Sequence, residues 1–257
     1  MVLGPKRVDL NRKIKYPTLA RLALEEKLRR EKQAADTRLG DWKALREALA
    51  LQMEKEKAWL EVQQNRKAFK EDVSASVSLL EDITGKPVRY FRAPGFSIRN
   101  SEAWAFEVIR ECGIEVDCSV FPAHHAHGGI PSYGKAVPSI ISHEGVRIKE
   151  FPICTKEIGG RHIIFSGGGY FRLFPYWLIR KWAEEKSEYM ISYIHPRDLD
   201  AGQPMIGELP WSRKFKSYVG LKGAEGKLRR LLTDFPFTDL AAADRLVDWT
   251  GAPVVEL

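Results

Sequence analysis

The sequence has few cysteines and no long apolar run, and no secretory leader is expected. Its three cysteines, Cys112, Cys118 and Cys154, lack the paired spacing of zinc ligands. An odd number of thiols without that spacing favours a reduced, cytoplasmic protein. The longest apolar runs, such as Tyr189–Ile194, are far shorter than the roughly 18–20 residues that cross a bilayer, so no membrane span is expected. The first twenty residues contain five lysines and arginines without a following apolar block, which argues against a secretory signal.

The signatures of several common enzyme classes are also missing. There is no Gly-x-Ser-x-Gly elbow, no His-Glu-x-x-His zinc motif and no dinucleotide fingerprint. The glycine-rich segment at residues 166–172 lacks the Gly-Lys-Ser/Thr ending of a phosphate-binding loop. No charge pattern around the cysteines marks a reactive thiol. These absences argue against serine hydrolase, zincin, nucleotide-binding and thiol-nucleophile chemistry.

The net charge of +7 lies in the first quarter of the chain. Residues 1–70 contain 18 Lys and Arg against 10 Asp and Glu, whereas residues 71–257 contain 23 against 24. The larger part of the chain therefore has no basic excess. A nucleic-acid-binding surface over the whole protein is not expected.

Residues 18–82 have the composition of helix. Ala, Leu, Glu, Lys, Arg and Gln dominate, with a proline at position 17 and one glycine at position 40. Gly40 and Asp41 predict a break between two helices. Because acids and bases alternate, we favour solvated amphipathic helices packed on a neighbour. The alternative is an arm that binds nucleic acid, an acidic membrane or a partner.

After Gly85 the sequence alternates between short apolar runs and helical stretches. This pattern predicts an α/β protein with a largely parallel sheet. Strands are expected at residues 88–91, 115–120, 146–152 and 189–194. Helices are expected at residues 101–112, with Ser101 as the N-cap, and at 175–185, 225–232 and 240–247.

Two polar residues follow predicted strands directly. Arg92 follows residues 88–91, and His195 ends the run 189–194. In parallel sheets the chemistry lies at the carboxyl ends of strands, where an arginine can orient a carboxylate and a histidine can act as acid or metal ligand. Gly95 leaves a backbone N–H free for an oxyanion. The alternatives are a tight turn with a structural ion pair and a half-buried histidine bonded to a carbonyl.

Two further segments are candidate binding elements. His124, His125 and His127 form the densest histidine cluster, but the prolines and glycines around them indicate a loop rather than a metal site. Tyr170 follows the glycine-rich segment, with Trp177 and Trp182 nearby. A flexible loop with these rings suits stacking on a sugar, and it suits core packing equally well.

These segments together resemble the polysaccharide deacetylases with NodB homology, specifically an exosortase-associated bacterial subgroup with its own C-terminal extension. The resemblance runs from about residue 65 to about residue 249. The motifs that carry it are Phe69–Asp72, Leu79–Gly85, Arg92-Ala93-Pro94 with Phe96–Ile98, Asp117–Pro122, Gly167–Leu173, Ile194-His195-Pro196, and the tail from Lys214 to Leu232.

The resemblance implies a fold and a set of roles. The fold would be an incomplete, distorted (β/α) barrel, with a charged helical arm at residues 1–64 and a deacetylase-like α/β domain at residues 65–257. Arg92 would orient the catalytic base and His195 would be the general acid. Gly95 would supply the oxyanion N–H. Phe96, Tyr170 and Ile194 would contact the substrate.

The sequence departs from the family in its first part. The family binds a divalent metal, typically zinc, through an Asp and two His, with a second Asp as base. No acidic pair follows an apolar strand before residue 70, and all six histidines lie at or after residue 124. We therefore assign no metal ligand or cofactor within this chain.

Two functions remain open. In the first, the protein belongs to a system that hydrolyses N-acetyl groups on an N-acetylated polysaccharide or oligosaccharide during exopolysaccharide biosynthesis, with a complementing protein chain as a partner. In the second, it is a catalytically inactive or truncated relative that binds glycan or protein. The sequence leaves open whether the protein is an enzyme.

Overall fold

The computed structural model describes residues 65–125, 128–186, 189–206 and 209–257. The chain divides into two compact units, and the boundary lies between Val88 and Arg89. The arm expected over residues 1–64, with its break at Gly40 and Asp41, lies outside the described residues. The domain boundary expected after residue 64 remains a prediction.

The described part of the first unit is a helix, α3 (Arg66–Thr84), and the turn that follows it. Asn65 caps its N-terminus, because its side-chain oxygen accepts from the backbone N–H groups of the first turn. Gly85 ends it with a positive φ of 65°, a conformation that glycine adopts without strain. The apolar side chains buried along this helix are Phe69, Val73 and Val77. Over residues 66–82 this confirms the predicted helix.

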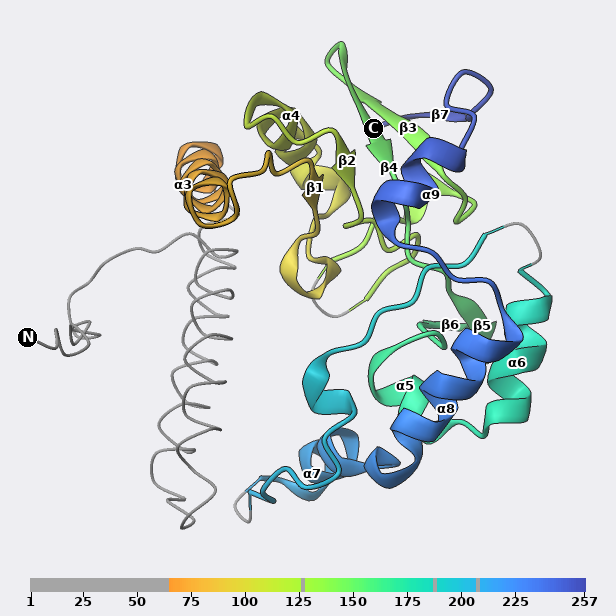
Figure 1. The fold of residues 1–257 in the computed structure, drawn as a ribbon. Helices are drawn as coiled ribbons and strands as arrows, with labels where there is room; N and C mark the ends of the chain where they lie inside the picture. The colour runs from red at the N-terminus through yellow and green to blue at the C-terminus, as the bar shows by residue number, and fades with distance from the viewer. Residues whose placement is uncertain (1–64, 126–127, 187–188, 207–208) are drawn as a thin grey trace, which may run out of the picture. The chain divides into compact units, whose positions relative to one another are not determined.

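The second unit is built on a five-stranded sheet (Figure 1). Its strands, in spatial order, are β1 (Tyr90–Phe91), β2 (Val116–Asp117), β4 (Val146–Glu150), β3 (Ser139–His143) and β7 (Val254–Glu256). Three neighbouring pairs are parallel, whereas β3 and β4 form an antiparallel hairpin. The chain is therefore α/β, with a sheet that is largely parallel, as expected.

The carboxyl ends of β1, β2 and β4 lie level with one another. Phe91 pairs with Asp117, and Asp117 pairs with Glu150. The residues that follow these strands therefore leave the same edge of the sheet. Strand β2 is shorter than the predicted 115–120 because the backbone N–H groups beyond Cys118 bond to side chains: that of Ser119 donates to Asp117 and that of Val120 to Glu150.

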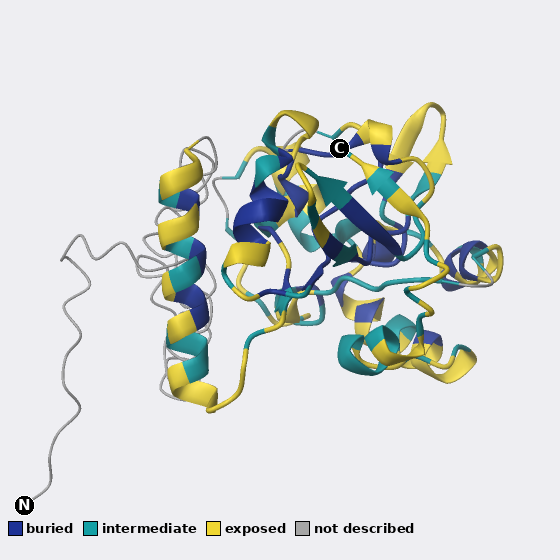
Figure 2. Cartoon of the chain, turned by 90° about the horizontal axis from the view of Figure 1, so that it is seen from above, coloured by how far each residue is buried: buried dark blue, intermediate teal, exposed yellow. Residues whose placement is uncertain are grey.

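Helices cover parts of this sheet. Helix α4 (Trp104–Glu111) contacts β3 and β4, and a 3-10 turn, η2 (Asn100–Glu102), precedes it. Helix α9 (Leu240–Leu246) packs near β2 with Trp249, over Val116, Cys118 and Phe151. Lys149 on β4 donates to Asp244 of α9 at 2.7 Å. Figure 2 shows the buried residues concentrated along the central strands and the inner side of α4.

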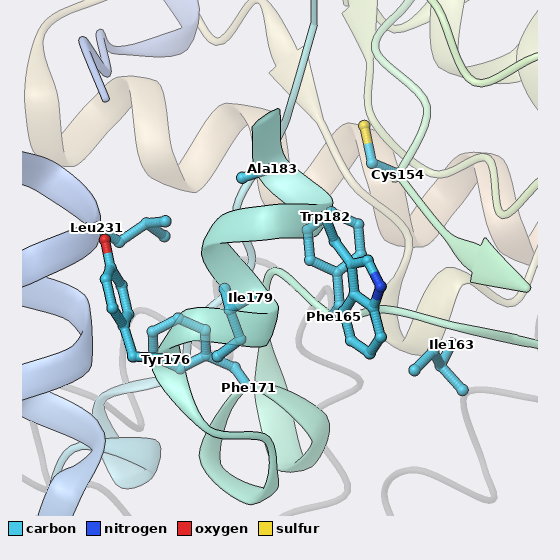
Figure 3. Close-up of a cluster of buried hydrophobic side chains, with 9 residues drawn as sticks. All are labelled: Cys154, Ile163, Phe165, Phe171, Tyr176, Ile179, Trp182, Ala183 and Leu231. Atoms are coloured by element: carbon cyan, nitrogen blue, oxygen red, sulfur yellow. The ribbon is translucent and has the colours of Figure 1, made fainter. Parts of the chain in front are cut away.

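A second apolar cluster lies beside the sheet (Figure 3). It is formed by α5 (Gly168–Leu173), α6 (Tyr176–Glu184), α8 (Leu221–Asp234) and the hairpin of β5 (Lys156–Ile158) and β6 (Arg161–Ile163). Phe165 packs edge to face on Trp182, with ring centroids 5.7 Å apart. The Tyr176 hydroxyl donates to Asp234 at 2.7 Å, which fixes α6 to the end of α8. A further helix, α7 (Trp211–Tyr218), precedes α8.

Most of the predicted elements are confirmed, with shifted ends. The strands at 88–91 and 146–152 correspond to β1 and β4, and the four helices correspond to α4, α6, α8 and α9. The N-cap expected at Ser101 is wrong, since Ser101 lies within η2 and Ala103 occupies the N-cap position of α4. The strand predicted at residues 189–194 is wrong, since only Tyr193 makes a bridge, with Gly167. One local reason is that the Ser166 hydroxyl donates to the Ile191 carbonyl, which a ladder would use.

Within the part of the chain that the structure describes, no helix is long and apolar enough to span a membrane.

Candidate functional site

Arg92 leaves the carboxyl end of β1 and lies on an aromatic surface. Its guanidinium carbon is 4.7 Å from the centroid of the Tyr193 ring and 5.9 Å from that of Phe96. The two rings meet edge to face, with centroids 5.2 Å apart. A guanidinium over ring faces is stabilised by cation–π attraction and keeps its N–H groups for a ligand.

Gly95 and Phe96 form the tight turn η1 (Pro94–Phe96) after Arg92. Gly95 has a φ of 64° and Phe96 a φ of 53°, which is a strained conformation for a bulky side chain. His125 bonds to the Phe96 carbonyl at 2.9 Å through its Nε2. Gly95 is exposed, and a Cβ at its position would have no atom within 4 Å, so its backbone is open to a ligand.

His195 joins this group through Tyr193. The Tyr193 hydroxyl and His195 Nε2 are hydrogen-bond partners, and the two rings lie edge to face with centroids 4.8 Å apart. Alternate residues of an extended segment point to the same side, which brings both side chains toward Arg92. The structure therefore places Arg92, Phe96 and His195 around one tyrosine ring.

The glycine-rich segment holds Tyr193 in place. Gly168 N–H donates to the Tyr193 carbonyl at 3.1 Å, and Tyr193 N–H donates to the Ser166 carbonyl at 3.4 Å. A Cβ on Gly167 would lie 1.8 Å from the Tyr193 carbonyl oxygen. The segment was expected to be a flexible loop. Instead, its glycines allow close backbone packing, and the residues from Gly168 onward are helix α5.

A buried ion pair supports the backbone of His195. Its N–H donates to Asp198 Oδ2 at 3.0 Å, and Asp198 Oδ1 lies 3.1 Å from Arg172 Nε. Arg172 also donates to the carbonyls of Lys216 and Ser217 at 2.8 Å each. Both charges are buried and paired, so removing one partner would leave the other uncompensated.

The pKa of His195 is lowered. Loss of hydration beside Tyr193 is the main cause, and the positive charges of Arg92 and Arg197 act in the same direction, against the opposing charge of Asp198. The residue as a whole is exposed, so solvent still reaches the ring edge. At neutral pH the ring is mainly neutral, with Nε2 engaged by Tyr193.

Two other expected contact residues lie elsewhere. Tyr170 is on α5, 46% exposed, and stacks on Phe174 with centroids 6.0 Å apart. Ile194 is half-buried and packs against the cluster of Figure 3, whereas Tyr193 packs against Phe96 and its neighbours. No contact places either residue beside Arg92 or His195 among the described interactions.

The described residues do not form the metal centre that the family resemblance implies. No group of three or more His, Cys, Asp and Glu among them is close enough to hold a metal ion. His125 and His195 use their Nε2 atoms in hydrogen bonds to Phe96 and Tyr193. His127, which belongs to the same histidine cluster as His125, lies outside the described residues. We therefore derive no step that passes through a metal.

Two open grooves lie away from this group. One, of about 500 Å³, is lined by residues that include Lys135, Lys156 and His162. The other, of about 340 Å³, is lined by Arg110, Arg147, Trp249 and their neighbours. Neither groove includes Arg92, Tyr193 or His195 in its lining.

Sequence reasoning did not identify Tyr193 as part of the site. The available signal was its position two residues before His195 in an extended segment, which puts both side chains on one face. The partner role of Asp198 was also not identified. Its position three residues after His195, following a proline, is typical of a capped turn, which the structure shows as η4 (Pro196–Asp198).

Comparison with family models gives a match to part of the chain. Residues 118–244 match a family described as "Domain of unknown function (DUF3473)". This family is associated with polysaccharide deacetylase-like proteins. The matched residues include Tyr193, His195 and Asp198 but not Arg92. No curated protein and no solved structure matches the chain.

Proposed function

We propose that the protein is polysaccharide deacetylase-like and acts on, or binds, an N-acetylated polysaccharide or oligosaccharide. The observation that carries the proposal is the meeting of Arg92 and His195 at one tyrosine ring. Arg92 and His195 are more than a hundred positions apart in the sequence, and each was predicted as a site residue from its own segment. The match over residues 118–244 supports the same assignment. We also propose that the fold is an incomplete, distorted (β/α) barrel. The proposed role is in bacterial exopolysaccharide biosynthesis, in the cytoplasm.

In the proposed reaction water adds to the acetyl carbon and gives a proton to a base, and the bond from that carbon to the sugar nitrogen breaks, which releases acetate and the free amine. His195, once protonated, donates a proton to the leaving amine. The exposed N–H of Gly95 stabilises the negative charge that develops on the acetyl oxygen. Arg92 orients a carboxylate base, which the described residues of the site do not supply. A complementing protein chain, or residues outside those described, would provide the base and the metal ligands that the family uses.

A second function, glycan binding without hydrolysis, is favoured by the exposed rings. Tyr170 is 46% exposed, Trp177 67% and Trp211 78%. Exposed aromatic faces stack on sugar rings at low entropic cost. In this function Arg92 and His195 bind the glycan and no bond is broken.

One experiment separates these functions. The purified full chain is incubated with an N-acetylated oligosaccharide and zinc, and acetate release is measured beside binding of the same oligosaccharide. Hydrolysis predicts acetate release that His195→Gln abolishes and His162→Gln preserves, because His162 lies on β6, outside the site. Binding without acetate release, weakened by Arg92→Gln, supports the second function. If the chain neither binds the oligosaccharide nor releases acetate, the proposal is contradicted.

A further inference from the structure

Two carboxyl groups lie together inside the second unit, at the same sheet edge where β1 ends before Arg92. Asp117 and Glu150 are the last residues of β2 and β4 and are paired in register. Both residues have no exposed surface. Two ionised carboxylates in such a place would repel each other strongly, so the pair is expected to keep one proton.

The hydrogen bonds indicate where the charge lies. Asp117 accepts two bonds from Ser119, one from the hydroxyl at 2.6 Å and one from the backbone N–H at 2.9 Å. Glu150 accepts one bond, from the Val120 N–H at 3.0 Å, and its Oε2 is buried without a donor. Because two donors stabilise a carboxylate better than one, the charge is on Asp117 and the proton is on Glu150.

The pair is connected to the Arg92 segment through Ser119. The Ser119 hydroxyl donates to Asp117 and accepts from the backbone N–H of Ala93 at 2.7 Å. Ala93 is buried and lies between Arg92 and the strained turn at Phe96. The carboxylate orients the hydroxyl, and the hydroxyl fixes the backbone next to Arg92. One chain of hydrogen bonds therefore runs from the sheet interior to the candidate site.

We propose that Asp117 and Glu150 act as a pair sharing one proton, and that this pair positions the Arg92 segment through Ser119. Both are positioning residues, since neither reaches the surface. Loss of the proton would put a second charge beside Asp117, which the structure could relieve only by moving β2 or β4. Such a movement would shift Ser119 and Arg92 with it.

The electrostatic surroundings favour the protonated pair. Burial raises the pKa of Glu150 well above its usual range, and the charge of Asp117 raises it further. The ionisable side chains on which the charges of the pair act are Cys118, Tyr133 and Tyr189. All three are neutral at pH 7, since burial raises the pKa of each. The positive charge of Arg92 acts on Cys118, the residue after Asp117.

The first test needs no variant. The side-chain carboxyl carbon of Glu150 is followed by NMR in the full chain from about pH 4 to about pH 8. An ordinary glutamate ionises near the low-pH end of this range. A signal that stays at its protonated position through pH 6 supports the proposal. A titration at the usual glutamate pKa would overturn it.

The second test examines the connection to Arg92 by amide hydrogen exchange. Ser119→Ala removes the acceptor of the Ala93 N–H, and we expect exchange at Ala93 to accelerate by tenfold or more, with a shifted Tyr193 ring signal. Ser142→Ala, on β3 and outside the network, is the matched control and should change neither. Unchanged protection at Ala93 in a folded Ser119→Ala protein would overturn the positioning role.

Discussion

At the scale of single residues, the candidate site depends on one tyrosine. Tyr193 contacts Arg92 through its ring face and His195 through its hydroxyl. The sequence identified the arginine and the histidine because each follows an apolar run. It did not identify the tyrosine, because an aromatic residue in an apolar run is normally read as core. The contacts of its ring with Arg92 and of its hydroxyl with His195 show that this side chain faces the site.

Removing the charge of Arg92 should raise the pKa of His195. The guanidinium is one of the groups that lower this pKa, so Arg92→Gln moves it back toward its ordinary value. The change is followed through the imidazole ring protons in an NMR titration. Arg161→Gln, on β6, is the control and should leave the titration unchanged. An identical His195 titration in Arg92→Gln would contradict the described arrangement.

The same lowered pKa has a consequence for stability. A histidine that binds its proton less tightly in the folded state stabilises the fold above its unfolded pKa, near 6.5. That contribution is lost as pH falls through the lowered folded value. The acid-side decrease in unfolding free energy should therefore be smaller in His195→Gln than in the wild type, as measured by urea titrations at several pH values.

Two glycines give a matched pair of stability predictions. Gly167→Ala places a methyl group 1.8 Å from the Tyr193 carbonyl oxygen, so the segment must move. We expect a loss of about 1–3 kcal/mol, the usual cost of overpacking. Gly223→Ala, inside α8 with nothing within 4 Å, should instead gain about 0.5–1 kcal/mol from helix propensity. Chemical denaturation measures both, and equal effects would contradict the close approach at Gly167.

At the scale of elements, the sequence predicted helices better than strands. Helix α6 and helix α8 have apolar residues at helical spacing. This spacing can be recognised within a short stretch of sequence, so it predicts a helix without knowledge of the fold. Strand β7 was not predicted, because its partner lies far away in the chain: Val254 pairs with Ile140. Strand β3 was also missed, although it forms a hairpin with the neighbouring β4. The error at residues 189–194 has a related cause. Apolar residues predict burial there, but the Ser166 hydroxyl bonds to the Ile191 carbonyl that a ladder would use.

Helix α9 should depend on its N-cap. Asp239 Oδ1 accepts from the Ala242 N–H at 2.7 Å, and the helix carries Asp244, the partner of Lys149. Asp239→Ala should lower the free energy of unfolding by about 1 kcal/mol, whereas Asp239→Asn keeps the acceptor and should change it by only a few tenths. Thermal denaturation monitored by circular dichroism compares them. Equal melting temperatures for Asp239→Ala and the wild type would argue against the cap.

At the scale of the whole molecule, the buried carboxyl pair should govern part of the pH dependence. A group with a raised folded pKa stabilises most below its unfolded pKa, and that contribution declines as pH rises toward the folded value. Glu150→Gln removes this titration while keeping a hydrogen-bond donor toward Asp117. The stability of the wild type relative to Glu150→Gln should therefore fall as pH rises from about 4.5. A difference that is constant with pH would contradict a proton on Glu150.

The α/β class and the strand ends that position Arg92 followed from sequence pattern, because apolar runs and helix signals report local burial. The Asp117 and Glu150 pair did not follow, since its two members are 33 positions apart and meet only through the register of β2 and β4. Pairing register is set by the whole sheet rather than by either strand. The position of Arg92 could therefore be predicted from the sequence, whereas the buried carboxyl pair could be identified only from the structure.

The central claim is that Arg92, Tyr193 and His195 form one binding site for an N-acetylated glycan. The most direct measurement is an NMR titration of the full chain with an N-acetylated oligosaccharide, following the side-chain signals of these three residues. The account predicts that all three shift together with a single saturation curve, which Tyr193→Ala abolishes. Saturable shifts confined to other residues, or none at any concentration, would contradict it.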